Sequence, residues 1–347
     1  MGKTYFHRVH EQTATRFWIN NVTRKEADMA LEAGAVGCTQ NPSYTWKMMQ
    51  NEEELPHVLE LLDPILKEEP DDTEALVKLQ RALVSDIAAH FMPLYEASGH
   101  RLGYVSIQGD PFHEDAETII RCARYNAKGS PNIMAKVPVT EEGLKAVKVL
   151  MAEGIAINAT EVMAVKQALD ICDAYNEVCS SMEKPPVVYY SHITGIYDEY
   201  LKNYVKDNNV DISPDTLWQA GMAVAKKTYK MTKERAPQVG FIGGGARGLH
   251  HFTEMVGANA VVTINWVGTA DKLIEQDPVV LQRFFMPTPE NVLDECVEKL
   301  PDFRKGFFIN NIKPEEYEDF GPVVLFRSQF ESAWKNALKF ITDRRKA

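Results

Sequence analysis

One lysine of this sequence stands inside a short apolar run. Lys136 lies in the segment IMAKVPVT, between Met134 and Ala135 on one side and Val137 and Pro138 on the other. Lysine is rarely buried without a partner, and burial disfavours the ammonium form, which lowers the pKa of the amine. A neutral, buried amine is the nucleophile that forms a Schiff base with a carbonyl substrate. The alternative is a lysine at a strand end whose ammonium group reaches solvent.

Three further residues are candidates for proton transfer. Asp110 follows Gln108 by two positions, which in a strand places both on the same side, although we favour an N-cap for the next helix. Glu161 directly follows Thr160, so we expect it to point away and to lie in the first turn of a helix. His192 ends a predicted strand and has an intrinsic pKa suited to acid–base catalysis, but histidines at such positions are more often structural.

A glycine-rich turn is a candidate anion site. The run GGGARG at 243–248 contains the pattern G-x-G-x-x-G, but no acidic residue ends the next predicted strand, which argues against a dinucleotide fold. A glycine-rich turn that opens a helix offers free backbone N–H groups to an anion, and Arg247 adds a positive charge. Glycine chosen for close packing is the alternative. We expect His250 and His251 on an exposed helix face rather than in a metal site.

Short apolar runs that alternate with amphipathic stretches must position these residues. Strands are predicted at 16–21, 35–39, 103–108, 133–137, 155–158, 187–191, 239–243 and 260–264, and helices at 24–33, 115–127, 141–153, 160–176, 214–235 and 246–256. This alternation indicates parallel βαβ units. Eight such units predict a closed (β/α)₈ barrel of the TIM type, and an open doubly wound sheet is the main alternative.

Two helical segments interrupt the alternation. Residues from about 43 to 100 form a charged insertion after the second strand, and residues from about 270 to 347 form a C-terminal extension. Neither has the composition of a linker between domains. We therefore expect a single barrel domain over residues 1–347, with the barrel core at about 16–265. Arg327, in the extension, could reach the barrel mouth.

The active site of a barrel lies at the carboxyl ends of its strands. The polar residues at those ends are Asn20, Asn21, Thr39, Gln40, Asn41, Gln108, Asp110, Lys136, Asn158, Thr160, Ser191, His192, Gly243–Arg247 and Asn265.

The motifs at these positions resemble those of the transaldolase family of Schiff-base aldolases. In order they are FWINNVTR, GCTQNPS, VSIQGDP, IMAKVPVTEEGLKAVKVLMAEGIAINAT and FIGGGARG. The resemblance covers residues from about 16 to 265, and its central block runs from Lys136 to Thr160. By this resemblance Lys136 is the Schiff-base lysine, and Asn41 and Asn158 contact substrate hydroxyl groups. The remaining site residues implied are Asn20, Gln108 and Thr160 as catalytic groups, and Thr39, Ser191, Gly245 and Arg247 as substrate-binding groups.

The sequence departs from the family pattern at several of these positions. Asn20 stands where the family has an aspartate acid/base, and Gln108 stands where it has a glutamate that activates water. An amide cannot exchange a proton near neutral pH, so both changes remove acid–base function. Ile196 replaces a phosphate-binding arginine and Gly245 replaces a serine, whereas Arg247 is retained.

The resemblance implies an enzyme of carbohydrate metabolism, as in the pentose phosphate pathway. Lys136 would form a Schiff base with a ketose or ketose phosphate, and a dihydroxyacetone unit would be cleaved or transferred without cofactor or metal. The alternative is a silent barrel that binds a sugar or sugar phosphate without turnover. His192 and Asp110 are the alternative candidates for the missing acid/base groups, and the resemblance also suggests a homodimer.

Composition and charge limit the binding partners and the cellular compartment that we expect. The 347 residues include 38 basic and 49 acidic side chains, a net charge of −11, which repels nucleic acid. Five widely spaced cysteines without a C-x-x-C pair argue against disulfide or metal frameworks and favour a reducing compartment. The N-terminus lacks the apolar core of a signal peptide, and no long apolar run exists. We therefore expect a cytoplasmic protein that acts on a small molecule, without a membrane or nucleic-acid partner.

Overall fold

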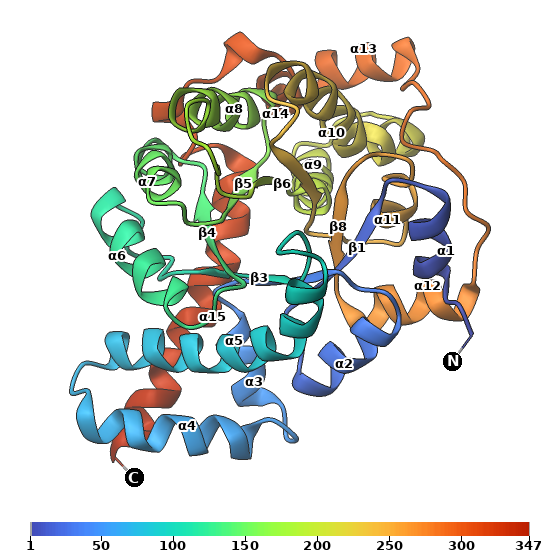
Figure 1. Cartoon of the computed structure of the whole chain (residues 1–347). Coiled ribbons are helices and arrows are strands. Elements are labelled where there is room, and N and C mark those ends of the chain that lie inside the picture. Colours follow the sequence, from blue (N-terminus) through green and yellow to red (C-terminus); the bar gives the residue numbers. More distant parts are fainter. Residues whose placement is uncertain (1, 347) are drawn as a thin grey trace.

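Eight parallel strands close into a barrel in the computed structural model, which describes residues 2–346 (Figure 1). Each strand pairs with the next one along the chain, and β8 pairs with β1. The strands are β1 (Arg16–Asn20), β2 (Gly37–Gln40), β3 (Tyr104–Gln108), β4 (Ile133–Pro138), β5 (Ile157–Val162), β6 (Val188–His192), β7 (Gly240–Gly243) and β8 (Val261–Ile264). The predicted (β/α)₈ barrel is confirmed, and the open sheet is wrong.

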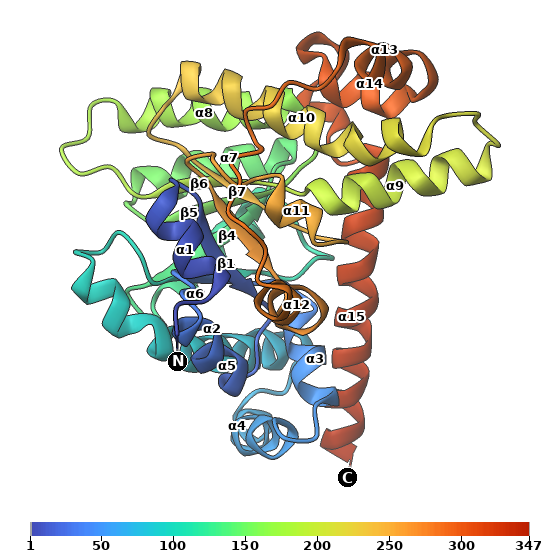
Figure 2. The same cartoon turned by 90° about the vertical axis from the view of Figure 1, so that its right-hand side faces the viewer.

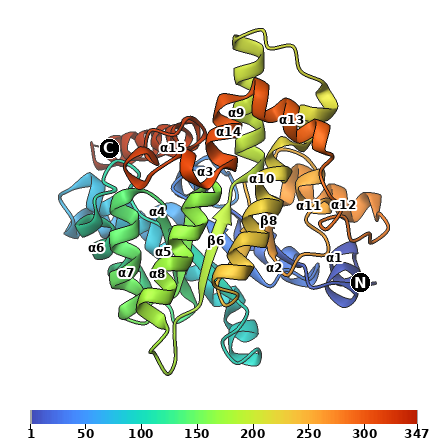
Figure 3. The same cartoon turned by 90° about the horizontal axis from the view of Figure 1, so that it is seen from above.

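Helices form the outer layer of the molecule. They are α1 (Tyr5–Gln12), α2 (Arg24–Glu32), α3 (Tyr44–Gln50), α4 (Leu55–Glu68), α5 (Asp72–Ala97), α6 (Ala116–Ala127), α7 (Glu141–Ala152), α8 (Val165–Cys179), α9 (Thr194–Asp207), α10 (Pro214–Arg235), α11 (His250–Thr253), α12 (Asp271–Gln276), α13 (Glu290–Lys299), α14 (Pro301–Phe307) and α15 (Gly321–Lys346). Figure 3 shows α13 and α14 beside α10, with which both are in contact. None of the helices within residues 2–346 has the length and apolar character needed to cross a membrane.

Short polar side chains begin the helices that follow β1, β3 and β4. Thr23, Asp115 and Thr140 each accept a hydrogen bond from a backbone N–H in the first turn of α2, α6 and α7, at 3.1, 2.9 and 3.0 Å. These contacts satisfy donors that a helix terminus otherwise leaves unpaired. They fix where each strand gives way to its helix, and therefore where the mouth of the barrel lies.

The barrel interior changes from apolar to polar along the strands. Residues two apart on a strand share a face, so Met134 lies on the same side as Lys136. Trp18, Tyr104 and Met134 belong to a small apolar cluster at the amino-terminal part of the barrel. One step further along, the inward side chains are amides and hydroxyl groups that bond to one another, as described below. A polar floor is thus built into the barrel.

Two predicted helices differ from the structure. The helix expected at 160–176 starts only at Val165, because β5 continues to Val162 through an irregularity in its pairing with β6. The helix expected at 246–256 is reduced to α11, which has four residues.

The insertion after β2 is more closely tied to the barrel than its charged sequence suggested. Its last helix, α5, packs directly against β3 and α2. Leu76, Leu79, Leu83 and Phe91 are among the side chains that α5 buries. This helix therefore serves as the crossover helix between β2 and β3, while α3 and α4 are the added elements.

The last helix of the chain lies across one end of the barrel. Figure 2 shows α15 beside α3 and α9, and α15 also contacts α5 and β5. Its buried face includes Phe326, Phe330, Trp334, Ala337 and Ile341. The contacts place the first half of α15 over the carboxyl ends of the strands, where the site is expected.

Candidate active site

Lys136 lies inside the barrel near the end of β4. It pairs in register with Gln108 on β3 and Asn158 on β5, and only 7% of its surface is exposed. Its Nζ donates a hydrogen bond to Gln108 Oε1 at 3.0 Å. Burial lowers the pKa of the amine from 10.5 to about 8, against the opposing effect of nearby carboxyl groups. The lysine is therefore buried, and the alternative in which its ammonium group reaches solvent is wrong. A larger fraction of its amine is neutral near pH 7 than in an ordinary lysine.

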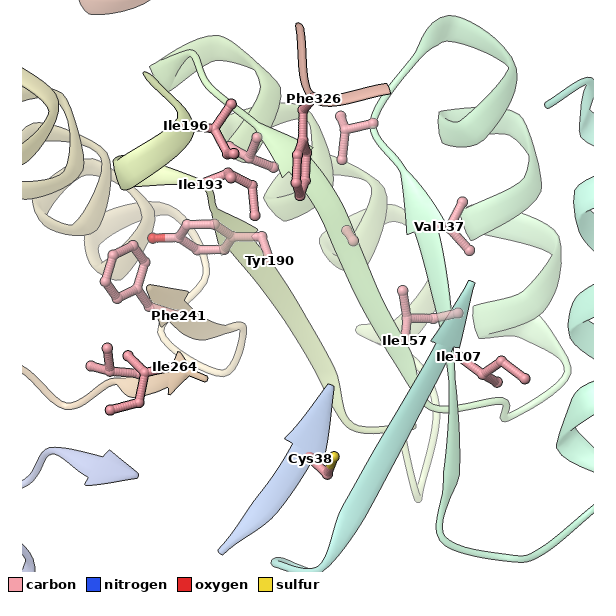
Figure 4. Close-up of a cluster of buried hydrophobic side chains, with 14 of the residues drawn as sticks. Cys38, Ile107, Val137, Ile157, Tyr190, Ile193, Ile196, Phe241, Ile264 and Phe326 are labelled. Carbon is pink, nitrogen blue, oxygen red and sulfur yellow. The ribbon is translucent and has the colours of Figure 1, made fainter. Parts of the chain in front are cut away.

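Two aromatic rings from α15 cover the lysine. The Nζ atom lies 6.0 Å from the ring centroid of Phe326 and 5.3 Å from that of Phe330. Figure 4 shows the Phe326 ring reaching from this helix towards the apolar side chains of Ile193 and Ile196. These rings exclude water from the amine while their faces tolerate its charged form. The alternation of apolar runs does not predict these two contacts, because α15 is distant from β4 in the chain.

The residues that follow Lys136 shape the end of its strand. Thr140 caps α7 by accepting a hydrogen bond from the Gly143 backbone N–H. A Cβ atom on Gly143 would lie 1.8 Å from the carbonyl oxygen of Pro138, so only glycine fits there. The pattern K-x-P-x-T-x-x-G therefore encodes a tight strand-to-helix turn that holds Lys136 in place.

A cavity with a volume of ≈ 410 Å³ opens above Lys136. Its size suits a small molecule. The expected residues that line it are Asn20, Asn21, Thr39, Asn41, Lys136, Ser191, Gly244, Gly245, Ala246, Arg247 and Asn265. The unexpected ones include Lys47, Thr263, Phe326, Gln329 and Phe330.

Asn20 belongs to a hydrogen-bond network across β1, β2 and β8. Its Oδ1 accepts a hydrogen bond from Thr39 Oγ1, and its Nδ2 donates one to Asn265 Oδ1, both at 2.8 Å. Thr39 Oγ1 also lies 2.7 Å from Thr263 Oγ1. The amide of Asn20 uses both its donor and its acceptor here, so it holds one wall of the cavity by neutral hydrogen bonds.

A second polar group lies deeper in the barrel. Ser191 Oγ donates to Asn158 Oδ1 at 2.7 Å, and Asn158 Nδ2 donates to Ser106 Oγ at 3.2 Å. Thr160 is also buried, and its hydroxyl group has no hydrogen-bond partner within residues 2–346. Of these residues, Ser191 lines the cavity, whereas Asn158 and Thr160 do not.

Asn41 is held at the rim of the cavity. Its Oδ1 accepts a hydrogen bond from Asn21 Nδ2 at 2.8 Å, and its backbone N–H donates one to Asn21 Oδ1 at 3.0 Å. Lys47, from α3, donates to the backbone carbonyl of Asn21 at 2.6 Å. This contact, together with an ion pair to Glu26 at 3.4 Å, holds a second cation at the cavity in addition to Arg247.

The expectation for Glu161 is wrong. Strand alternation predicted that it points away, but β5 has a bulge between Ala159 and Val162, and Glu161 adopts a left-handed φ of +63°. Bulges re-aim side chains in this way beside functional sites. Glu161 is fully buried, and its Oε1 accepts a hydrogen bond from Gln108 Nε2 at 3.0 Å.

Glu114 approaches the same amide. Its Oε1 lies 3.5 Å from Gln108 Nε2. Burial, and then the neighbouring Glu161, raises the pKa of Glu114 well above its usual range, and burial also raises the pKa of Glu161. Two buried carboxyl groups thus lie behind Gln108, on the side opposite Lys136.

His192 and Asp110 do not line the cavity above Lys136, although Asp110 lines a smaller hollow that Gln108 and Lys136 also border. His192 is buried outside the cavity, with Nδ1 3.2 Å from Thr194 Oγ1, and burial lowers its pKa to about 3, which keeps it neutral. Asp110 instead bonds locally: it accepts from the Phe112 N–H at 2.9 Å and faces His113 Nδ1 at 2.8 Å. The N-cap of the next helix is Asp115 rather than Asp110.

The glycine-rich turn differs from the predicted anion site. Because α11 is a single turn, no long helix opens at Arg247, and the Arg247 backbone N–H already donates to His251 Nδ1 at 3.2 Å. The Arg247 side chain still lines the cavity, where it pairs with Glu199 and with Gln329. Gly245 has a φ of +66°, and a Cβ there would lie 2.5 Å from Ile193. The turn therefore supplies a guanidinium group and close packing rather than a helix terminus.

The histidine pair after this turn is not an exposed face. His251 is buried, and its Nε2 lies 2.9 Å from Asp198 Oδ2. His250 Nε2 lies 4.0 Å from the same oxygen. The three side chains present potential ligand atoms within 4.8 Å of one another, but both ring nitrogens of His251 already have partners. This cluster fixes the turn that carries Arg247.

Comparison with known proteins shows which family this chain resembles. The family model described as Transaldolase/Fructose-6-phosphate aldolase matches residues 17–295. A transaldolase of Trichodesmium erythraeum is 28% identical over 252 residues, 65% of this chain and 64% of that protein. A transaldolase of Saccharopolyspora erythraea is 29% identical over 167 residues, 46% of this chain and 44% of that protein. The chain thus spans about half to two thirds of the length of these relatives.

Among solved structures, an IMP dehydrogenase/GMP reductase-like protein from Corynebacterium glutamicum aligns with a TM-score of 0.38 and 12% identity, covering 71% of this chain and 62% of that one. At that score the likeness says nothing about function.

Proposed function

Because the chain belongs to the transaldolase/fructose-6-phosphate aldolase family, we propose that it is a transaldolase-type enzyme in which Lys136 forms a Schiff base with a ketose or ketose phosphate. One observation carries this proposal. The amine is buried on the floor of a cavity of ≈ 410 Å³, with a neutral amide oxygen rather than a carboxylate as its hydrogen-bond partner. A carboxylate in direct contact would hold the lysine protonated, whereas an amide leaves the free amine available.

The chemistry follows from the Schiff base. The Lys136 amine attacks the ketose carbonyl carbon, the oxygen leaves as water, and a positively charged iminium forms. The bond between C3 and C4 of the ketose then breaks, its electron pair moves into the iminium to give an enamine, and the C4 hydroxyl proton is lost as that carbon becomes an aldehyde. The enamine attacks an acceptor aldehyde, or it takes up a proton and is hydrolysed to dihydroxyacetone.

The proposed phosphate contacts are Arg247 and Lys47. Both line the cavity, and a guanidinium group binds phosphate through paired hydrogen bonds. Ile196 stands where the family carries another arginine and is fully buried. Lys47 supports phosphate binding as a partial substitute, because it brings the second positive charge from a different element.

The silent binding barrel stays the second candidate. The specific observation that favours it is that the side chains of Asn20 and Gln108 are amides engaged in hydrogen bonds, and an amide does not exchange a proton near neutral pH. Such a site would bind a sugar and form no adduct, or would form one that does not proceed.

Borohydride trapping distinguishes these candidates. The protein is incubated with a panel of ketoses and ketose phosphates that includes fructose 6-phosphate, reduced, digested and mapped by mass spectrometry. The proposal predicts a covalent adduct on Lys136 that is absent in Lys136→Met, and release or transfer of a three-carbon unit. Lys145, which is exposed on α7, provides the matched control as Lys145→Met. A wild-type protein that binds the sugar without an adduct would support the silent barrel.

A further inference from the structure

We propose that Glu161 and Glu114 are positioning residues for Lys136: they share one negative charge behind the Gln108 amide, which fixes that amide and transmits the charge to the lysine. This inference rests on the proposed function and deepens it. It assigns a role to two buried carboxyl groups that the Schiff-base scheme does not use.

The Gln108 amide is oriented from both ends. Its Oε1 accepts a hydrogen bond from Lys136 Nζ at 3.0 Å, while its Nε2 faces Glu161 Oε1 at 3.0 Å and Glu114 Oε1 at 3.5 Å. Reversing the amide would place its N–H₂ group against the lysine and its oxygen against two carboxyl groups. With Lys136 as an ammonium group and Glu161 ionised, only the observed orientation satisfies both neighbours.

The backbone of β5 is distorted in a way that serves this contact. A strand without the bulge would send Glu161 away from the barrel, and a left-handed φ of +63° is uncommon for a residue other than glycine. The distortion brings a carboxyl group into a fully buried place where its Oε2 has no partner among residues 2–346. Glu114 Oε2 also lacks a hydrogen-bond partner there. Burial of incompletely paired carboxyl groups does not stabilise a fold by itself, which points to a role at the site.

The surrounding charges indicate that the pair holds a single negative charge. Within residues 2–346, the cation that approaches these carboxyl groups besides Lys136 is Arg327 of α15, whose Nη1 lies 3.9 Å from Glu114 Oε2. Arg327 is shared with Glu318, at 2.8 Å. Two buried carboxyl groups beside one partly neutralised cation do not both ionise easily, so the pair retains one proton.

A single negative charge on the far side of the Gln108 amide suits Schiff-base chemistry at Lys136. Both Glu161 and Glu114 raise the pKa of Lys136 against the lowering caused by burial. They act across an amide, so the lysine is not locked in a direct ion pair. The same charge stabilises the iminium that the lysine becomes, because the positive charge then lies at the former Nζ position. By the resemblance, the family has a glutamate at the position of Gln108. In this chain the carboxyl groups of Glu161 and Glu114 lie further from Lys136, behind the Gln108 amide.

A titration that needs no substrate tests this inference. The protonation midpoint of Lys136 is measured by labelling with trace acetic anhydride across a pH series, with the modified peptide quantified by mass spectrometry. In the double variant Glu114→Gln/Glu161→Gln the midpoint should fall by about one pH unit. Each single variant should shift it by less than half as much, because the remaining carboxyl group then ionises fully. Glu117→Gln, an exposed position on α6, is the matched control and should leave the midpoint unchanged.

Infrared spectroscopy provides a second test that uses only the single variants. The shared charge requires one protonated, buried carboxyl group at pH 7, whose C=O stretch should be present in the wild-type protein and absent in Glu114→Gln and in Glu161→Gln. A folded double variant with an unchanged Lys136 midpoint, or single variants that keep the protonated band, would overturn the inference. A shifted midpoint in a protein that forms no adduct would overturn the proposed function alone. An adduct with an unchanged midpoint would overturn only the present inference.

Discussion

Gln108 stands where the family has a glutamate, and the sequence and the structure lead to different interpretations of this change. From the sequence it is the loss of a carboxylate, and its reversal to glutamate, together with Asn20→Asp, is expected to restore proton transfer. The structure places Glu161 and Glu114 within 3.5 Å of the Gln108 amide nitrogen. The position is therefore an amide because its surroundings are already acidic.

We predict that Gln108→Glu lowers adduct formation at pH 7 by at least about tenfold. A third carboxyl group in direct contact with Lys136 raises the pKa of the lysine and reduces the free amine, so the pH optimum should move upward. Trapping rates across a pH series provide the measurement. A gain of activity in Gln108→Glu at pH 7 would contradict this account.

Asn20→Asp should have the opposite effect on activity. Asn20 is remote from the acidic group around Gln108, so its new carboxylate should raise turnover of sugar phosphates by about 10²-fold.

Arg247→Ala should weaken binding of phosphorylated donors by about 1.5–3 kcal/mol, the value of a hydrogen bond to a charged group. We expect a higher KM for fructose 6-phosphate with KM for unphosphorylated fructose unchanged. The comparison of the two sugars separates phosphate recognition from general damage to the turn. If both KM values rise equally, the Arg247 side chain supports the turn rather than the phosphate.

At the scale of elements, alternation of apolar runs was enough to place the barrel strands. The predicted strand at 133–137 is β4 (Ile133–Pro138), and the helix expected at 214–235 is α10 (Pro214–Arg235). Predictions from periodicity were wrong where the backbone departs from regular strand geometry. The bulge in β5 turns Glu161 inward, and nothing in the letters AINATEV specifies a left-handed residue there.

Long-range contacts were the other feature that periodicity could not supply. The polar residues at strand ends could be gathered from the sequence because parallel strands share one edge. Phe326 and Phe330 lie in a helix outside the βα alternation, so their place over Lys136 depends on how α15 docks. The one signal available was Arg327 between them, which does reach Glu114 at the barrel mouth.

Phe330→Ala should change both stability and the pH dependence of the site. Removing a buried phenylalanine costs about 3–5 kcal/mol of unfolding free energy. It also admits water beside Lys136, which moves its pKa upward from about 8 towards 10.5. Adduct formation should therefore need a higher pH than in the wild-type protein. Phe340→Ala, a partly exposed phenylalanine of the same helix, should leave the pH dependence unaltered.

At the scale of the whole molecule, Lys136 has a stability cost that depends on pH. Its pKa is about 8 in the folded protein and near 10.5 as an ordinary lysine, so the unfolded chain binds more protons between these values. Unfolding free energy therefore rises with pH through that window. Below about pH 8 the folded protein carries the full cost of a buried ammonium group.

Lys136→Met should accordingly be more stable than the wild-type protein at pH 7. The gain should be constant below about pH 8 and should diminish as the pH approaches 10.5. Urea unfolding of both proteins at pH 7, 8 and 9 measures this difference. A methionine variant that is less stable at pH 7 would mean that the amine contributes packing or hydrogen bonds that outweigh its desolvation.

The position of α15 in the chain has a consequence for the newly made protein. A ribosome completes all eight strands before it makes Phe326 and Phe330. Until those rings dock, Lys136 lacks their cover, so less of its amine is neutral than in the finished fold. The nucleophile therefore reaches its full reactivity only after the last helix of the chain is in place.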